Sequence, residues 1–286
     1  MLDERFEPLE ELDGADTDIY TFGRIGKHCV VIACPGPAYG WLSASNRGRD
    51  MMHKFKSLQV VLMVGIGGGI PSAANDIRLG DVVISYPTGT RGCVLQYDMS
   101  EDGKFSCTEF LKRPPRLLLT AVNRMRAAAF QKDLCYPTYI QQALQRNTQM
   151  LRDFDRPGSQ YDRLFQIQYE HPPTATTCDE CSTEWEVVRD EREDHVSQPH
   201  YGIIISANVA IKNGEIREQL QKDTEALCLE MDDTTVLMHD FPCIVIRGIC
   251  DYADSHKYRQ WQGYAALAAA SYTKELLQYI PHDQLS

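Results

Sequence analysis

Long apolar runs are absent from this chain of 286 residues. No stretch approaches the roughly 20 apolar residues that a membrane-spanning helix requires. The first residues, Met1 to Arg5, also lack the basic and apolar regions of a secretory signal peptide. We therefore expect a cytoplasmic protein that has no membrane partner.

Positive charge is scarce as well. The chain has 29 lysines and arginines against 40 aspartates and glutamates, which gives a formal net charge of −11. Such a chain repels nucleic-acid phosphate and anionic membrane surfaces. We expect no nucleic acid among its partners, because a small neutral or cationic ligand is easier to accommodate.

The ten cysteines lack the spacing of a disulfide framework. Several of them lie inside apolar runs, where cysteine behaves as a small buried hydrophobic residue, and this usage indicates a reducing compartment. The cysteines in question are Cys29, Cys34, Cys228, Cys243 and Cys250.

One cysteine pair, Cys178-x-x-Cys181, has a spacing that is typical of metal sites. It supplies half of a zinc site and would need histidine partners such as His171, His195 or His200. The alternative is a polar loop with two free thiols. We favour the loop from sequence alone and expect no metal.

Nucleotide-binding fingerprints are missing. Gly65-x-Gly67-Gly68-Gly69 follows an apolar run, but Ile70 stands where a dinucleotide fingerprint has its third glycine, and Pro71 follows instead of a helix. The chain also has no Gly-Lys-Ser/Thr for a P-loop. Because glycine has no Cβ, the cluster could instead let the backbone approach a flat ring or a sugar. A purely structural tight turn is the alternative.

Apolar runs bounded by turn residues predict buried strands, and longer amphipathic stretches between and after them predict helices. The predicted strands are 28–34, 58–64, 81–85, 202–206, 226–229 and 241–246, and the clearest helices are 41–56, 115–129, 212–222 and 260–279. Strands that alternate with helices predict an α/β fold with a central mixed β-sheet covered by helices on both faces.

The region from Asp153 to His200 has little apolar periodicity after Tyr169 and carries a charged run at 189–194. The halves of the chain on either side each have too few strands to close a core. We therefore interpret residues 1–286 as a single domain in which 153–200 is a long, loop-rich surface insertion with solvated charges.

Two aspartates, Asp251 and Asp254, follow the predicted buried strand at 241–246. A carboxylate where a core strand ends is held by rigid backbone, which general acid chemistry requires. The glycine cluster and the acidic cluster Glu230-Met231-Asp232 also follow apolar runs. Three such features at strand ends predict one ligand site.

In this order and spacing these motifs resemble those of the nucleoside phosphorylase/nucleosidase superfamily, and in particular its fungal-type purine nucleoside phosphorylase-like domains, which are often fused to repeat or NTPase modules. The resemblance runs from about Asp16 to Ile280. It is carried by the motifs at 64–69, 76–85, 230–232, 247–254 and 261–264. It implies the nucleoside phosphorylase/hydrolase-like fold and cleavage of the N-glycosidic bond of a purine nucleoside.

The resemblance also implies roles for individual residues. Asp251 matches the acid that protonates the leaving base, and Asp232 matches a carboxylate that accepts hydrogen bonds from the ribose. Asp232 departs from the family, which has glutamate there. The remaining ligand-binding positions are Gly67, Gly68, Asn208, Ile211, Glu230 and Met231. The alternatives are structural: Asp251 could cap a helix or pair with Arg247, Asp232 could cap a helix, and Asp254 fits a helix entry.

Ile66 stands where phosphate-using relatives commonly have serine, and its side chain cannot donate to phosphate oxygens. This favours water as the nucleophile, with phosphate as the alternative co-substrate and no other cofactor. Arginines that could hold phosphate are Arg24, Arg47, Arg49, Arg78 and Arg91.

Family domains normally open with a strand whose glutamate helps to activate water. This chain starts at Met1-Leu2-Asp3-Glu4, which resembles the sequence just after that strand. We expect either a start further upstream or a changed activity. Alternatives to an enzyme are thus a non-catalytic nucleoside- or partner-binding module, or a pocket with other small-molecule chemistry. Because family sites are completed by a neighbouring subunit, we also expect a homo-oligomer.

Overall fold

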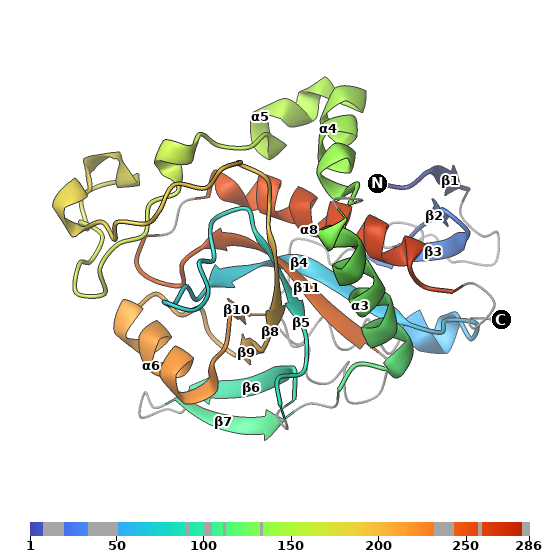
Figure 1. Cartoon of the computed structure of the whole chain (residues 1–286), viewed down its shortest axis with the longest axis horizontal. Helices are drawn as coiled ribbons and strands as arrows, with labels where there is room; N and C mark the ends of the chain where they lie inside the picture. The colour runs from blue at the N-terminus through green and yellow to red at the C-terminus, as the bar shows by residue number, and fades with distance from the viewer. Residues whose placement is uncertain are drawn as a thin grey trace.

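The computed structural model describes residues 1–7, 20–33, 51–89, 92–99, 105–110, 113–131, 134–231, 243–256 and 259–281. Within them, eight strands form one mixed sheet in the order β7-β6-β9-β10-β4-β11-β5-β8 (Figure 1). Their bounds are β7 Phe105–Phe110, β6 Val94–Met99, β9 Ile204–Ala207, β10 Cys228–Glu230, β4 Val61–Gly69, β11 Cys243–Asp251, β5 Val82–Ser85 and β8 Pro199–Gly202.

The centre of the sheet is built from strands that are apolar on both faces. Every residue of β11 and β5 is buried, which is the burial expected of strands covered on both sides. β11 pairs in parallel with β4 and antiparallel with β5. The strands were predicted to end at Val64 and Ile246. In the structure β4 ends at Gly69 and β11 at Asp251, so each strand is five residues longer at this end than predicted.

Helices cover both faces of the sheet, as predicted. On one face α8 (Trp261–Gln278) packs on β11 and β4, and it is covered in turn by α3 (Arg116–Phe130), α4 (Tyr136–Arg146) and α5 (Leu151–Phe154). On the other face Leu220 of α6 (Gly214–Thr224) belongs to a second core cluster with Ile205 and Leu229. The Asn213 side chain caps α6 by accepting from the Ile216 amide at 3.0 Å.

Three of the predicted helices match α3, α6 and α8 with end shifts of one or two residues. The predicted helix at 41–56 is described only from Met51, and residues 51–54 are helical. α4, β2, β6 and β7 were not among the predicted elements. None of the described helices is long and apolar enough to cross a membrane.

A separate antiparallel sheet contains β1 (Glu4–Phe6), β2 (Tyr20–Ile25) and β3 (His28–Ala33). The Lys274 ammonium of α8 fastens it to the main body by contacts with the Met1 carbonyl, at 2.9 Å, and the Asp3 carboxylate. The predicted strand at 28–34 is confirmed, but the prediction that Cys29 is buried is wrong. β3 is less completely covered than the central strands of the main sheet, and both Cys29 and Ile32 are exposed. Cys228, Cys243 and Cys250 are buried as predicted, and Cys34 lies outside the described residues.

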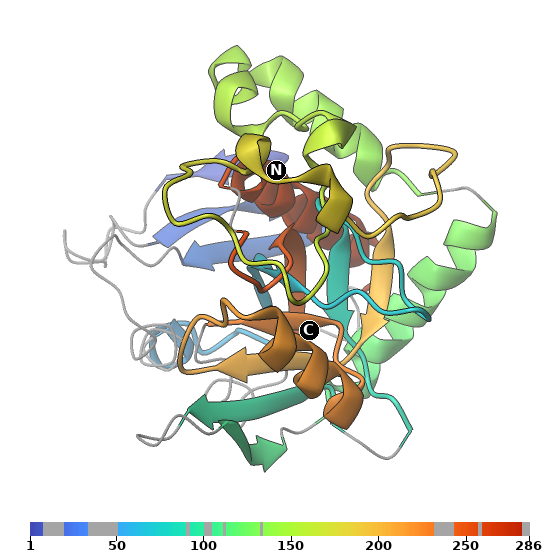
Figure 2. The same cartoon turned by 90° about the vertical axis from the view of Figure 1, so that its left-hand side faces the viewer.

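The connecting segment, residues 155–198, joins α5 to β8 and contains three short 3-10 turns, η2 (Ser159–Tyr161), η3 (Cys178–Glu180) and η4 (Thr183–Trp185). It lies on the side of the molecule away from β1, β2 and β3 in Figure 1 and faces the viewer in Figure 2. Its only isolated β-bridge among the described residues joins Phe165 to Glu186.

Asp81, just before β5, ties the end of this segment to the sheet. Its buried carboxylate accepts from both terminal nitrogens of Arg192 at 2.8 Å and from His200 Nε2 at 2.9 Å. The charged run that was predicted to be solvated therefore includes one residue, Arg192, that is ion-paired with the main sheet region. Beyond it β8 pairs with β5, so that strands from before and after the segment share one sheet.

Candidate functional site

The ends of β4, β10 and β11 meet around one glycine. In the sheet register Gly68 lies opposite Asp251 of β11 and opposite Leu229 of β10. The structure therefore brings together four of the predicted site residues, Gly67, Gly68, Glu230 and Asp251, which we call the strand-end site. Their role in ligand binding stays a prediction.

The glycines of this site lie within strand β4 and not in a turn, and close packing requires them. A Cβ on Gly67 would lie 2.6 Å from Cys228 Sγ and 2.8 Å from the Leu229 carbonyl oxygen. A Cβ on Gly68 would lie 2.8 Å from Asp251 Oδ1. Real Cβ atoms essentially never approach so closely, so Gly68 provides the space that the Asp251 carboxylate occupies.

Asp251 is the last residue of β11, and 9% of its surface is exposed. Its Oδ1 accepts from the Ala253 amide at 2.8 Å, which closes an Asx turn. Ala253 has φ of 51°, in the left-handed region that non-glycine residues rarely adopt. Such an outlier persists only where the surroundings hold it, and it is often found next to functional groups.

Glu230 and Arg247 form an ion pair beneath the strand ends, and their side chains are 1% and 2% exposed. Gly65 makes this possible, because a Cβ there would collide with the Arg247 guanidinium. The Glu230 carboxylate of β10 therefore faces Arg247 of β11 across the intervening strand β4. Any contribution of Glu230 to ligand binding would act through this pair.

The other predicted ligand-binding residues lie around these strands. Met231, directly after β10, is 53% exposed. Asn208 follows β9, and its side-chain oxygen accepts from the Met99 amide at 3.0 Å. Ile211 is buried in the core cluster that also contains Ala253. Asp232 lies outside the described residues, so its predicted ribose contact stays a prediction.

Arg217 of α6 anchors the turn that follows Asp251. Its guanidinium donates to the Tyr252 carbonyl at 2.8 Å and pairs with Asp254 at 3.1 Å. Burial opposes ionisation of Asp254, but His256 and Arg217 outweigh it and lower the pKa of this carboxyl. The prediction that Asp254 enters a helix is wrong, because α8 begins at Trp261 with Gln260 as its cap residue.

The connecting segment holds the same turn from outside. The Tyr252 hydroxyl donates to Asp162, and Arg189 donates to the Tyr252 hydroxyl at 2.8 Å. The His171 amide donates to Ser255 Oγ at 2.9 Å. The backbone after Asp251 is thus held by contacts from α6 and from the connecting segment, which position its carboxylate before any ligand arrives.

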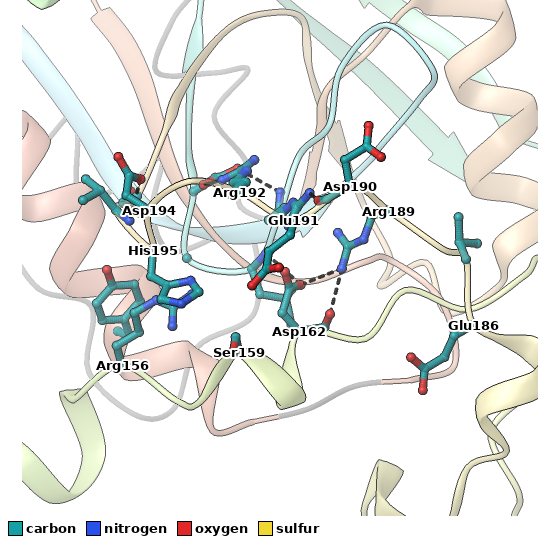
Figure 3. Close-up of a pocket in the computed structure, with 18 of the residues that line it drawn as sticks. Arg156, Ser159, Asp162, Glu186, Arg189, Asp190, Glu191, Arg192, Asp194 and His195 are labelled. Atoms are coloured by element: carbon teal, nitrogen blue, oxygen red, sulfur yellow. Dashed lines mark hydrogen bonds and ion pairs between the residues drawn. The ribbon is translucent and has the colours of Figure 1, made fainter.

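A charged cavity of about 440 Å³ separates the connecting segment from the sheet (Figure 3). Figure 3 shows Arg189 directed toward Asp162, with which it pairs at 3.2 Å. At the same cavity Arg78 pairs with Asp76 at 2.8 Å and Arg192 pairs with Asp81. In these three ion pairs the arginines are neutralised by carboxylates. We therefore interpret this part of the cavity wall mainly as an attachment of the connecting segment to the sheet.

Of the arginines considered for phosphate binding, Arg24 pairs with Glu4 at 2.8 Å on the exposed small sheet, and Arg78 pairs with Asp76. Arg47, Arg49 and Arg91 lie outside the described residues. Neither described arginine belongs to the strand-end site.

The Cys178 and Cys181 thiols are buried and lie with His171 in a group whose potential ligand atoms are all within 4.8 Å of one another. Of the other histidines considered, His200 donates to Asp81 and His195 is exposed at the charged cavity. Sequence reasoning named His171 as one of three partners but had no signal that selected it.

The fold is that of the nucleoside phosphorylase/nucleosidase superfamily, as the motifs predicted. Futalosine hydrolase of Helicobacter pylori matches 97% of this chain and 88% of its own with 15% identity and a TM-score of 0.53. The 5'-methylthioadenosine/S-adenosylhomocysteine nucleosidase of the same organism matches 97% and 89% with 16% identity and a TM-score of 0.55.

A much more similar sequence is a nucleotide-binding leucine-rich repeat (NLR)-like protein of Hyaloscypha variabilis, which is 43% identical over 280 residues. The match covers 97% of this chain but only 27% of that protein. No protein-family model matches the chain.

Proposed function

We propose that this chain cleaves the N-glycosidic bond of a purine nucleoside at the strand-end site. The observation that carries the proposal is the placement of the Asp251 carboxylate, which lies at the end of a fully buried strand, in the space left by Gly68. The likeness in fold to a futalosine hydrolase and to a 5'-methylthioadenosine/S-adenosylhomocysteine nucleosidase supports it.

In this reaction the leaving base gains negative charge while the sugar gains positive charge, so the site needs a proton donor for the base and acceptors for the sugar hydroxyls. Asp251 serves as the proton donor, because the end of β11 and the turn after it hold its carboxylate in a fixed position. Asp232 accepts from the ribose, Met231 packs under the sugar, and Asn208 and Ile211 line the side of the base.

We further propose that water is the nucleophile, because Ile66 offers no donor to phosphate. The match to part of an NLR-like protein supports the fungal-type assignment, in which such domains are fused to repeat or NTPase modules. A homo-oligomer in the cytoplasm is the accompanying expectation. Light scattering that gives a single-chain mass at micromolar concentration would contradict the oligomer.

The test is base release from a panel of purine nucleosides that includes adenosine, inosine and 5'-methylthioadenosine, followed by liquid chromatography with and without phosphate. Loss of a general acid costs about 10²–10⁴-fold in rate, so Asp251→Asn should lose most base release while ligand affinity stays within about tenfold. Asp223→Asn, on the exposed face of α6, is the matched control and should keep the wild-type rate.

Three results would count against parts of this proposal. A tenfold acceleration by phosphate with accumulation of sugar 1-phosphate would exclude water as the nucleophile. Calorimetric binding of nucleosides without any cleavage would favour the non-catalytic binding module. No binding at all, together with unfolding of Asp251→Asn, would make Asp251 a structural residue.

A further inference from the structure

The connecting segment has very little core of its own. Among the residues that the structure describes, its only separate cluster of buried apolar side chains consists of Phe165, Cys178 and Cys181, with Tyr169 packed against them. Such a cluster cannot offset the backbone entropy of ordering a long irregular segment. Small irregular units are commonly stabilised by disulfides or by a structural metal ion.

Arg163 shapes the turn that carries the two thiols. Its guanidinium donates to the carbonyls of Cys178 and Cys181, to the latter at 2.8 Å, and its Nε donates to Glu186 at 2.6 Å. The turn between the cysteines is closed by the Cys181 amide, which donates to the Cys178 carbonyl at 3.1 Å. Both side chains therefore point from one fixed turn into the same buried space.

The spacing of the ligand atoms suits a tetrahedral ion. In a tetrahedral zinc site with Zn–S bonds of about 2.3 Å, neighbouring ligand atoms lie about 3.8 Å apart. The Sγ atoms of Cys178 and Cys181 and a ring nitrogen of His171 all lie within 4.8 Å of one another. Shifts of about an ångström or less would bring them to the bonding geometry.

The hydrogen bond of His171 leaves one of its two ring nitrogens available as a ligand. Its Nε2 lies 3.2 Å from the Thr177 carbonyl oxygen, which can only accept, so this nitrogen carries the proton. Nδ1 then keeps its lone pair. Histidine ligands of metals usually donate their other ring nitrogen to a carbonyl or carboxylate in this way.

His256 supplies a second, independent indication. It is 95% buried, lines the same cavity as Cys178 and Cys181, and its Nε2 has no hydrogen-bond partner among the described residues. Its Nδ1 faces Asp254 at 3.5 Å. Its ring stacks on Phe165 with centroids 4.1 Å apart and meets the His171 ring edge-on at 5.5 Å. A buried imidazole with an unsatisfied nitrogen needs a partner, and a metal ion is one.

We propose that His171, Cys178 and Cys181 bind a zinc ion, with His256 as the fourth ligand. Soft thiolates combined with imidazole select zinc over magnesium or calcium. On binding, the two S–H bonds break, two Zn–S bonds form, and the thiol protons leave with the displaced water. Four protein ligands make the site structural rather than catalytic.

The ion would connect the segment to the turn after Asp251. His256 belongs to that turn, whereas His171, Cys178 and Cys181 belong to the segment, and the His171 amide already donates to Ser255. One zinc ion would therefore cross-link two parts of the chain that are far apart in sequence. This cross-link would give the connecting segment the stabilisation that its small apolar cluster does not supply.

The first test measures metal in the full 286-residue chain. Purified protein is analysed by native mass spectrometry and elemental analysis, and the metal-free protein is titrated with Zn²⁺ and with Co²⁺. We expect one zinc per chain and, with cobalt, the visible absorption of a tetrahedral thiolate complex. Removal of the metal from wild-type protein should open residues 155–198 to protease first. None of these readouts depends on nucleoside cleavage.

The second test assigns the ligands. Cys178→Ser, Cys181→Ser and His171→Ala should each lower zinc affinity by more than the roughly 10- to 100-fold that loss of an outer-shell contact costs. His256→Gln should shift the cobalt spectrum and weaken binding. The matched control is Cys29→Ser, an exposed thiol on β3, which should keep full affinity. Folding of each variant is checked by circular dichroism.

Three outcomes would overturn the proposal. One is a metal-free protein that takes up neither Zn²⁺ nor Co²⁺ at micromolar concentration under reducing conditions. Another is equal zinc affinity in wild type, Cys178→Ser and Cys29→Ser, which would indicate binding elsewhere. A Cys178–Cys181 disulfide in freshly purified protein, found as a loss of two hydrogens in the intact mass, would also contradict it.

Discussion

The strand-end site and the connecting segment achieve order in different ways. Around Asp251, order comes from the hydrogen-bond ladders of β4, β10 and β11 and from a core that buries β11 completely. In residues 155–198 it comes from side chains: Arg192 on Asp81, Arg189 on Asp162, and the cysteine and histidine cluster. The first region is held mainly by its backbone, and the second is held mainly by its side chains.

The two regions meet at Tyr252. Its backbone follows Asp251, and its hydroxyl lies between Asp162 and Arg189 of the segment. A site that must hold one carboxylate in place therefore uses both kinds of support. Substitutions in the sheet and in the connecting segment should show how much each region contributes to the stability of the protein.

The largest effect is expected at the buried pair of Arg247 and Glu230, because breaking it leaves a charge without its partner. Removal of one member of a buried ion pair typically costs about 3–5 kcal/mol. Arg247→Met should therefore lower the free energy of unfolding by that amount in urea denaturation. The double variant Arg247→Met/Glu230→Met should lose less than the single one, since no unpaired charge remains. Equal losses in both variants would mean that packing, and not charge, dominates here.

The next effect concerns Asp81, which fastens the connecting segment. Asp81→Asn removes a charged acceptor from Arg192 and His200 and should cost about 2–3 kcal/mol. Protease should cut residues 155–198 sooner, while β11 keeps its protection from hydrogen exchange. Simultaneous loss of protection in β11 would show that segment and sheet unfold as one unit.

The same carboxylate gives a pH dependence. Burial alone would raise the pKa of Asp81, but the hydrogen bonds and charges of His200 and Arg192 outweigh it and lower the pKa below its ordinary value of 3.8. Stability from this group is therefore present above that value and lost as the pH falls through the folded-state pKa. The stability difference between wild type and Asp81→Asn should be constant near neutral pH and shrink below a pH of about 4.

The centre of the sheet was predictable because its strands are unbroken apolar runs. Residues 81–85 and 226–229 mark β5 and β10 closely, and 260–279 marks α8. β6 and β7 were not predicted because their mixed polar and apolar residues are typical of strands with one solvent-facing side. α4 was not predicted because Pro137 lies in its first turn, where proline is tolerated, although in a sequence proline usually indicates the end of a helix.

The site was predictable only in part. The strand-end motifs indicated that Gly68 and Asp251 would lie near one another, but the partners of Arg247 and Asp254 come from β10 and α6 and depend on tertiary packing. His171 lies beside Cys178 although nothing in the sequence favoured it over His195 or His200, and His256 lies at the same cavity although 75 or more positions separate it from the cysteines. No local pattern carries such contacts.

A smaller effect is expected from Gly68→Ala. The added Cβ would lie 2.8 Å from Asp251 Oδ1 and 2.9 Å from the Ala253 Cβ, so the carboxylate or the turn must shift. Overpacking of this kind costs about 1–3 kcal/mol. If Asp251 acts as the acid, base release should fall more than stability does. Gly89→Ala is the control. Gly89, unlike Gly68, has a positive φ of 59°, so this substitution strains the backbone, but the added Cβ meets no atom within 4 Å and nucleoside binding should stay unchanged.

The smallest effect should come from the exposed pair of Arg24 and Glu4 on the three-stranded sheet, whose side chains are 50% and 52% exposed. A solvent-exposed ion pair contributes about 0.2–1 kcal/mol and is screened by salt. Arg24→Ala should therefore change the free energy of unfolding by less than about 1 kcal/mol, and the difference should fade in molar salt. Both pairs join an arginine to a glutamate of another strand in the same sheet, β2 to β1 here and β11 to β10 across β4 in the buried pair. A loss as large as that of Arg247→Met would mean that burial does not separate the two pairs, and that β1 and β2 are held by this contact rather than by their ladder.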